Sequence, residues 1–433
     1  MLCGVSLTGG EATEIVVMAH SENQPASRLL TGQFAWLLAV QLSYGFVFSA
    51  FLLLPKYLVA VHGAGADVVG QVSGVALFAA VATVPLASWL LSRVSRGALI
   101  VAGALLGGGA SVAFAFVTAV GPVMYGLRVA QGVAFVLVFN AGGTLVTDLV
   151  PEERLGQALG VWGLAMLLTN AIAPAALEPF ADQYGWDPVF YVAGAASLIA
   201  AAMGVAVALR GGAPEPHPDD GGAKPTALGI RAAESSASGR RGVFDRRRRA
   251  VFAATALMGA GLGTMFTFVP PFALDLGLER VSGFFLGYTA AAIAARVGLG
   301  NLADRFGRAR VSAIALVFYA ASVSTTAWLS PALLVVVGAG IGLSHGIAYP
   351  ALNALAVEDA MSRQRGPVMA YYNGAFNVGF AVCVTTFGPV ARAAGYPAIF
   401  LLAGALVLAG ALALVRLPVR ALHRVAKLDR NPS

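Results

Sequence analysis

The stretch Gly298–Arg310 reads Gly-Leu-Gly-Asn-Leu-Ala-Asp-Arg-Phe-Gly-Arg-Ala-Arg, and a weaker copy of it stands earlier in the chain, at Ser88–Gly97. The matching pairs of arginines are Arg93 with Arg305 and Arg96 with Arg308. The separation of these pairs is about 211 positions, and other pairs in the chain repeat at nearly the same distance.

Two of these further pairs lie well outside the first motif. Arg154-Leu155-Gly156 is repeated by Gln364-Arg365-Gly366, and Gly185-Trp186 is repeated by Gly395-Tyr396. A period of this length is far longer than the 20–50 residues of a solenoid repeat, so it indicates a duplicated domain. In an apolar chain, a duplicated domain favours a membrane transporter whose binding site lies between the two halves.

The composition indicates a membrane protein. Apolar residues make up 58% of the 433 residues and charged residues 11%, against roughly 45–50% and about 25% in soluble domains. The 52 glycines suit the close helix contacts found in lipid. We attribute the net charge of +7 to membrane topology and not to nucleic-acid binding.

Twelve apolar runs are long enough to cross a bilayer. They lie at 33–55, 67–91, 97–119, 122–147, 156–178, 188–210, 250–274, 281–302, 310–329, 331–357, 366–391 and 396–416. The predicted organisation is an N-terminal tail (1–32), a six-helix bundle (33–210), a polar linker (211–249), a second six-helix bundle (250–416) and a basic tail (417–433). The expected fold class is therefore an all-α integral membrane protein with twelve transmembrane helices in two pseudo-symmetric six-helix bundles.

The distribution of Lys and Arg predicts the orientation. These residues concentrate in the tails, the linker and the even-numbered connections, whereas the odd-numbered connections hold only Lys56, Arg280 and Arg392. By the positive-inside rule, both termini face the cytoplasm. We expect a multi-pass protein of the cytoplasmic membrane, with the lipid bilayer as its surroundings.

Polar side chains inside predicted spans are the candidates for a substrate cavity, because such groups are costly in hydrocarbon unless they face protein or water. The candidates are Gln41, Tyr44, Asn140, Tyr349, Asn353, Tyr372, Asn373 and Asn377. They would give a cavity with apolar walls and few polar anchors.

Motifs for other chemistries are missing from the sequence. It has no glycine-rich phosphate loop ending in Lys-Ser/Thr and no Cys/His cluster with metal-ligand spacing. We therefore expect no enzyme activity, cofactor or metal, and a transport reaction driven by an ion or substrate gradient.

The chain resembles the major facilitator superfamily. Gly300-x-Leu302-Ala303-Asp304-Arg305-x-Gly307-Arg308 is similar to the signature loop of that family, and Arg128-x-x-Gln131-Gly132 is similar to its fourth-span motif. The resemblance implies twelve helices, alternating access, a monomer and a role for Arg128 in proton coupling or the conformational cycle. Two departures stand out: Ser92 replaces the Asp of the first signature loop, and Ala173–Glu178 lacks the glycines typical of antiporters.

The signature loop suggests a conformational latch. In this fold, Asp304 should lie beside the start of the fifth span, near Leu155–Ala158, where a carboxylate can bind the free N–H groups of a helix N-terminus. The candidate latch residues are Gly300, Asp304, Arg305 and Arg308, with Arg93 and Arg96 in the first copy. The alternative is that Asp304 merely pairs with Arg305 or Arg308.

Four residues are candidates for transport or coupling: Arg128, Gln131, His345 and Asp148. Arg128 lies within a span, where a charge needs a partner such as a carbonyl, Gln41 or a substrate anion. His345 carries the side chain that ordinarily titrates near neutral pH, so it could move protons. For Arg128 the alternative is a structural arginine bonded to helix carbonyls, and for His345 a packed histidine.

The sequence thus predicts proton-coupled export of a small organic, amphipathic molecule. One alternative is proton-coupled uptake of a sugar or organic acid. A second, from another class, is a membrane signalling or assembly protein that no longer transports, which the missing Asp at position 92 would favour. A membrane enzyme is a third, with no catalytic motif to support it.

Overall fold

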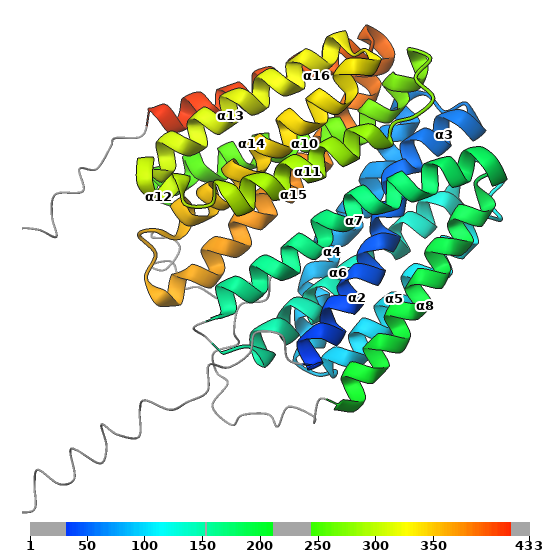
Figure 1. The fold of residues 1–433 in the computed structure, drawn as a ribbon, viewed down its shortest axis with the longest axis horizontal. Helices are drawn as coiled ribbons and strands as arrows, with labels where there is room; N and C mark the ends of the chain where they lie inside the picture. The colour runs from blue at the N-terminus through cyan, green and yellow to red at the C-terminus, as the bar shows by residue number, and fades with distance from the viewer. Residues whose placement is uncertain (1–31, 152–153, 211–243, 417–433) are drawn as a thin grey trace, which may run out of the picture.

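The computed structural model describes residues 32–151, 154–210 and 244–416. Within these ranges the regular elements are helices, and no strand occurs. The two tails and nearly all of the predicted linker lie outside the described residues. Figure 1 shows two groups of helices lying side by side, the earlier half of the chain forming one and the later half the other. The all-α fold predicted from the apolar runs is confirmed.

The first bundle begins with one long span that is built from three elements in succession. Its helices are α2 (Gly32–Ala50), η1 (Phe51–Leu53), α3 (Leu54–His62), α4 (Ala66–Leu91), α5 (Arg96–Phe114), α6 (Pro122–Leu149), α7 (Leu155–Tyr184) and α8 (Asp187–Arg210). The first span was predicted to end at residue 55, but the helical path continues to His62. Pro55 is tolerated there because it stands in the first turn of α3, where its missing N–H has no helical partner to lose.

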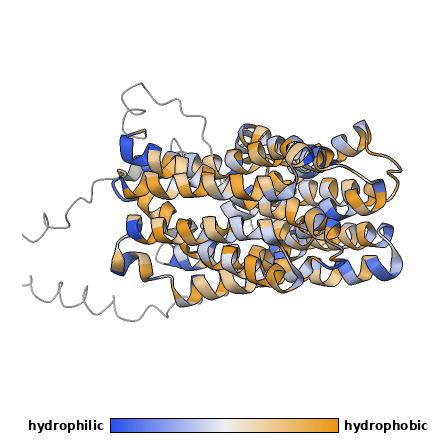
Figure 2. Cartoon of the chain, turned by 90° about the horizontal axis from the view of Figure 1, so that it is seen from above, coloured by the Kyte–Doolittle hydropathy of each residue, from blue (hydrophilic) through white to orange (hydrophobic). Residues whose placement is uncertain are grey.

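The second bundle repeats this arrangement. Its elements are α10 (Arg246–Asp275), α11 (Ser282–Gly298), α12 (Leu302–Phe306), α13 (Arg308–Thr325), η3 (Thr326–Trp328), α14 (Pro331–Val357), α15 (Ser362–Ala394) and α16 (Tyr396–Val415). Eleven helical segments of the described chain are long and apolar enough to cross a membrane. The remaining predicted span corresponds to α11, which is shorter at 17 residues. Hydrophobic residues make up most of the length of the helices, and hydrophilic residues gather toward the helix ends (Figure 2).

The bundles have two ends, which we name by the chain. The terminal face is the end where α2 begins and α16 ends, and it carries the connections 92–95, 299–307 and 358–361. The distal face carries the connections 63–65, 185–186 and 276–281. Arginines of the described chain are concentrated at the terminal face, as the positive-inside pattern predicted.

Glycines allow the closest helix contacts. A Cβ added at Gly379 of α15 would lie 1.8 Å from the carbonyl oxygen of Ala256 in α10, and one at Gly342 of α14 would lie 2.0 Å from that of Tyr288 in α11. The two bundles also meet through glycine, since a Cβ at Gly70 of α4 would lie 2.4 Å from the carbonyl oxygen of Val384 in α15. Lipid is as apolar as these helices, so the hydrophobic effect does not drive their association. Close backbone contact of this kind packs the helices together instead.

These contacts predict the effect of one added methyl group. We expect Gly379→Ala to destabilise the purified protein by roughly 1–3 kcal/mol, because the helices must move apart to admit the Cβ. Gly109→Ala on α5 is the matched control, since nothing lies within 4 Å of its added Cβ. Thermal unfolding in detergent measures both, and equal melting temperatures for the two variants would contradict the packing argument.

Candidate functional site at the bundle interface

A buried carboxylate ties the two bundles together at the distal face. Glu178 lies near the end of α7 and its side chain is fully buried. Its Oε1 accepts a hydrogen bond from the backbone N–H of Val281 at 2.8 Å, and its Oε2 accepts one from that of Ser282 at 2.7 Å. These N–H groups belong to the start of α11, where a helix has no internal acceptors for them. Glu178 thus caps a helix of the other bundle.

Lys56 completes this junction from the first span. Its Nζ lies 2.8 Å from Oε1 of Glu178 and donates to the carbonyl oxygen of Glu279 at 2.5 Å. Asp182, one turn further along α7, lies 3.4 Å from the same Nζ. Burying a charge is tolerable when it is paired and hydrogen-bonded, and both Lys56 and Glu178 meet that condition.

A second ion pair crosses the interface nearby. Arg392 of α15 lies 2.7 Å from Asp67 at the start of α4. The Arg392 side chain is 70% exposed, so solvent weakens this pair.

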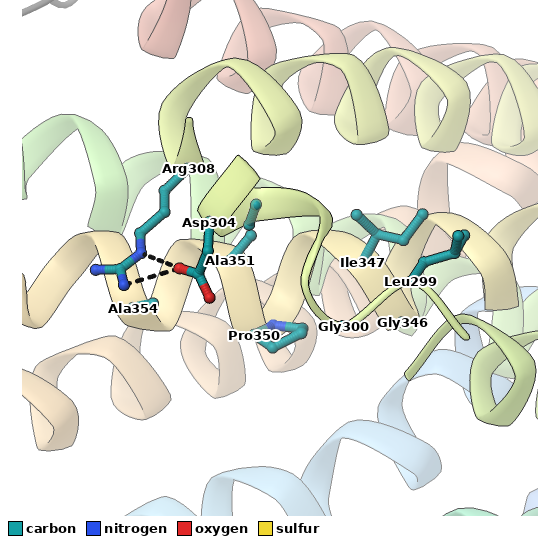
Figure 3. A pocket seen from close by; sticks show the side chains of 10 residues that line it. Leu299, Gly300, Asp304, Arg308, Gly346, Ile347, Pro350, Ala351 and Ala354 are labelled. Atoms are coloured by element: carbon teal, nitrogen blue, oxygen red, sulfur yellow. Dashed lines mark hydrogen bonds and ion pairs between the residues drawn. The ribbon is translucent and has the colours of Figure 1, made fainter. Parts of the chain in front are cut away.

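At the terminal face the signature loop is held within its own bundle. Asp304 of α12 accepts hydrogen bonds from Nε and Nη2 of Arg308 at 3.2 and 2.9 Å. Figure 3 shows the two side chains pointing toward each other beside α14, at a cavity of about 230 Å³ lined by Gly300, Pro350 and Ala351. In this conformation Asp304 pairs with Arg308 and does not cap α7, so the latch stays a prediction for another conformation.

Other charges of this face also form ion pairs inside their own bundle. Glu358 contacts both Arg308 and Arg247 of the second bundle. In the first bundle, Arg96 lies 3.0 Å from Asp148. The other candidate latch arginines, Arg93 and Arg305, are exposed, and Arg93 stacks on Trp89 at 4.5 Å. Asp148 is therefore an ion-pair partner at the terminal face.

Arg128 is bound by helix carbonyls and by its own motif. Its Nε donates to the carbonyl oxygen of Val72 at 3.2 Å and its Nη1 to Oε1 of Gln131 at 2.6 Å. The Nη2 group lies 3.5 Å from the carbonyl oxygen of Ser73. These partners join α6 to α4 within one bundle. The geometry matches the structural alternative for Arg128, and its role in coupling remains untested.

His345 lies in an aromatic cluster of the second bundle. Its Nδ1 is 2.9 Å from the hydroxyl of Tyr288, while its Nε2 is buried and has no hydrogen-bond partner among the described residues. Tyr349 and Phe376 pack around the ring at 5.4 and 5.9 Å. Two predicted cavity residues join this cluster, since Tyr349 donates to Asn373 at 2.7 Å.

Arg296 is a cation at the interface without an ion-pair partner among the described residues. It lies in the last turn of α11, and its guanidinium comes within 3.6 Å of a Cβ built on Gly163 of α7 in the other bundle. Its Nε is buried without a partner, and no carboxylate of the described chain is within ion-pair distance.

The other predicted cavity residues are divided between the two bundles, and a cavity that joins them stays a prediction. Gln41 and Asn140 are almost fully buried in the first bundle, and the amide of Asn140 has no partner in the described chain. The hydroxyl of Tyr44 would meet a Cβ at Gly107 of α5, so it faces its own bundle. The structure gathers Tyr349, Tyr372 and Asn373, because the Tyr372 hydroxyl donates to the carbonyl oxygen of Tyr349 at 2.6 Å. Asn353 and Asn377 are half-buried.

Sequence reasoning missed the Lys56–Glu178 junction, and Arg296 was not among its candidate residues. Lys56 was placed in a connection because the first span was ended too early. The sequence did contain one signal that could have drawn attention to Lys56, because it is the only lysine between the predicted first span and residue 223. Nothing in the sequence indicates that Glu178 reaches the backbone of α11, because that contact exists only between bundles.

Comparison with known proteins identifies the family to which these features belong. The profile of the Major Facilitator Superfamily matches residues 35–298 and 280–432. Human Monocarboxylate transporter 11 is 29% identical over 289 residues, which cover 63% of this chain and 55% of that protein, so the match spans only about half of the human protein. Multidrug resistance protein MdtG of Citrobacter koseri is 23% identical over 293 residues, 66% of this chain and 69% of that protein.

The fold is also found in a solved structure. The crystal structure of a mutant of the nucleoside transporter NupG superposes with a TM-score of 0.70 at 14% identity, covering 88% of this chain and 99% of that one. At this identity the likeness concerns the fold alone.

The contacts of Arg128 predict that lysine cannot replace it. Arg128→Lys removes the planar fork that reaches three acceptors, so we expect roughly 1–3 kcal/mol of lost stability. Arg310→Lys on the exposed start of α13 should leave the stability unchanged. Thermal unfolding in detergent compares them, and an unaltered Arg128→Lys protein would show that the guanidinium is not structural.

Proposed function

This chain belongs to the Major Facilitator Superfamily, and we propose that it transports a small organic monoanion with an apolar body by alternating access. The observation that supports this substrate class is Arg296, a guanidinium at the bundle interface without a carboxylate partner among the described residues. A partly buried cation without a counter-ion is costly, and an anionic ligand would remove that cost. The similarity to Monocarboxylate transporter 11 agrees with this class.

The surroundings of Arg296 suit an anion with an aromatic or aliphatic body. His345, Tyr349 and Phe376 provide ring surfaces, and Nε2 of His345, which has no hydrogen-bond partner among the described residues, would offer one more polar contact. In the first bundle, the rings of Phe48 and Phe135 lie 4.6 Å apart and would offer further aromatic surface. Apolar walls with few polar anchors are typical of small-molecule sites.

We further propose that transport is coupled to protons and that the terminal face lies in the cytoplasm. Arginines of that face, such as Arg93, Arg247 and Arg310, outnumber the cations of the distal face, which supports this orientation. A proton that accompanies a monoanion makes the cycle electroneutral. The direction of net transport then follows the gradients, so export and uptake of an organic acid are two modes of one carrier.

A second candidate is the proton-coupled export of amphipathic, drug-like molecules. The similarity to MdtG, a multidrug resistance protein by name, favours it. The aromatic rings at the interface would bind such molecules as well. The two candidates differ in whether Arg296 is needed.

The first test is transport by the Arg296→Gln variant in proteoliposomes, with benzoate as the probe. We expect counterflow of labelled benzoate to fall by about tenfold or more, because a charge-assisted hydrogen bond contributes roughly 1.5–3 kcal/mol. Arg416→Gln, exposed at the end of α16, is the control that should transport normally. If the wild type carries an amphipathic cation but no benzoate, the second candidate is preferred.

Asp304 remains our proposal for the latch of the terminal face. Asp304→Asn keeps the shape of the side chain but loses the charge that would bind a helix N-terminus, so we expect transport to fall several-fold with normal expression. Asp275→Asn, the same change at an exposed carboxylate of the distal face, is the control. Reconstituted Asp304→Asn protein with full transport would rule out the latch.

A further inference from the structure

We propose that Glu178 and Lys56 are the gate of the distal face: Glu178 holds this face closed by capping α11, and the face opens only when these hydrogen bonds break. This inference rests on the alternating-access cycle proposed above. It assigns positioning residues to that cycle and does not depend on which substrate is carried.

The first argument concerns the hydrogen bonds that the two carboxylate oxygens of Glu178 accept. Both carboxylate oxygens accept backbone N–H groups of the other bundle, from Val281 and Ser282, and Oε1 also accepts Lys56. Charge-assisted hydrogen bonds of this kind are about twice as strong as neutral ones. The negative charge also lies at the partially positive end of α11. Few single side chains could hold two bundles together more firmly.

The second argument concerns what remains after the bundles separate. Lys56 of α3 and Glu178 of α7 belong to the same bundle, so their ion pair can persist while the contacts to Val281, Ser282 and the Glu279 carbonyl are released. Asp182 also stays beside Lys56. Opening therefore leaves neither buried charge without a partner, and at this junction water replaces only the three contacts that cross the interface. A junction built in this way can break and reform.

The third argument is the contrast between the two faces. At the terminal face, Asp304, Glu358 and Asp148 pair with arginines of their own bundle. At the distal face, Glu178 binds across the interface, and so does the exposed pair Asp67–Arg392. Charged groups therefore bind between the bundles at the distal face and within each bundle at the terminal face. This arrangement is expected of a carrier that is closed on its distal side.

Spin labels can measure the opening directly. Cys3 and Cys383 are replaced, and labels are placed at Val61 and Leu276, two exposed positions on opposite bundles at the distal face. A second pair, at Val94 and Phe306, reports the terminal face. Pulsed electron paramagnetic resonance then gives the distance distribution of each pair in lipid nanodiscs, with no substrate needed.

The main variant is Glu178→Asp, which keeps the charge but is one methylene shorter, so it cannot reach both Lys56 and the start of α11. We expect the ratio of distal-open to distal-closed protein to rise by about tenfold or more, because at least one charge-assisted hydrogen bond is lost. The terminal-face distance should shorten in the same molecules. Arg392→Gln, which removes only the exposed pair, should shift the ratio by less than about threefold.

A charge swap separates the gate from an ordinary salt bridge. Lys56→Glu combined with Glu178→Lys can restore an ion pair, but a lysine cannot accept the N–H groups of Val281 and Ser282. We expect the swapped protein to remain distal-open. A return to the wild-type distances would show that the ion pair alone closes the face and would overturn the proposal.

Two further outcomes decide the matter. If Glu178→Asp is too unstable to purify, the double variant Lys56→Gln with Glu178→Gln takes its place. We expect the same result for it, which is more distal-open protein and a shorter terminal-face distance. Unchanged distributions, or longer distances at both faces together, would overturn the gate. Because this readout needs no substrate, a wild type that fails to transport benzoate would contradict the proposed substrate and leave the gate to be judged by the distances.

Discussion

The arrangement of this molecule depends on the contact between one buried carboxylate and the N-terminus of a helix in the other bundle. Glu178 accepts two backbone N–H groups of α11, while Lys56 neutralises it from the first span. The remaining interface between the bundles is formed largely by small and apolar side chains, which pack equally well against lipid. A directional, charged contact therefore determines which side of the interface is closed.

The signature loop and the distal junction use the same chemistry at opposite faces. Asp304 was predicted to cap the start of α7, and Glu178 does cap the start of α11. In the present conformation Asp304 is bound instead by Arg308. A free helix N-terminus offers a carboxylate backbone donors and a favourable dipole, and these sites become available or hidden as the bundles tilt. A carrier that alternates between two such caps would expose each face in turn.

The interface also explains why single polar residues are poor guides to a binding site. Arg128 and His345 were selected because ionisable groups are rare in spans, yet carbonyls of α4 bind Arg128 and Tyr288 binds His345. Arg296 was not selected, although it meets the other bundle and has no acid beside it among the described residues. The difference lies in the partners, which a sequence does not display.

The sequence alone determined the helical class, the position of most spans and the duplication of the chain. Bilayer thickness imposes a minimum length of apolar helix, and the repeated motifs mark equivalent positions in the two halves. Only the tertiary structure decided that Lys56 lies within a helix beside Glu178, that Asn140 is buried without a partner in the described chain, and that Arg296 faces the interface. The physical reason is that helical periodicity is local, whereas hydrogen bonds between residues more than a hundred positions apart depend on how two bundles pack.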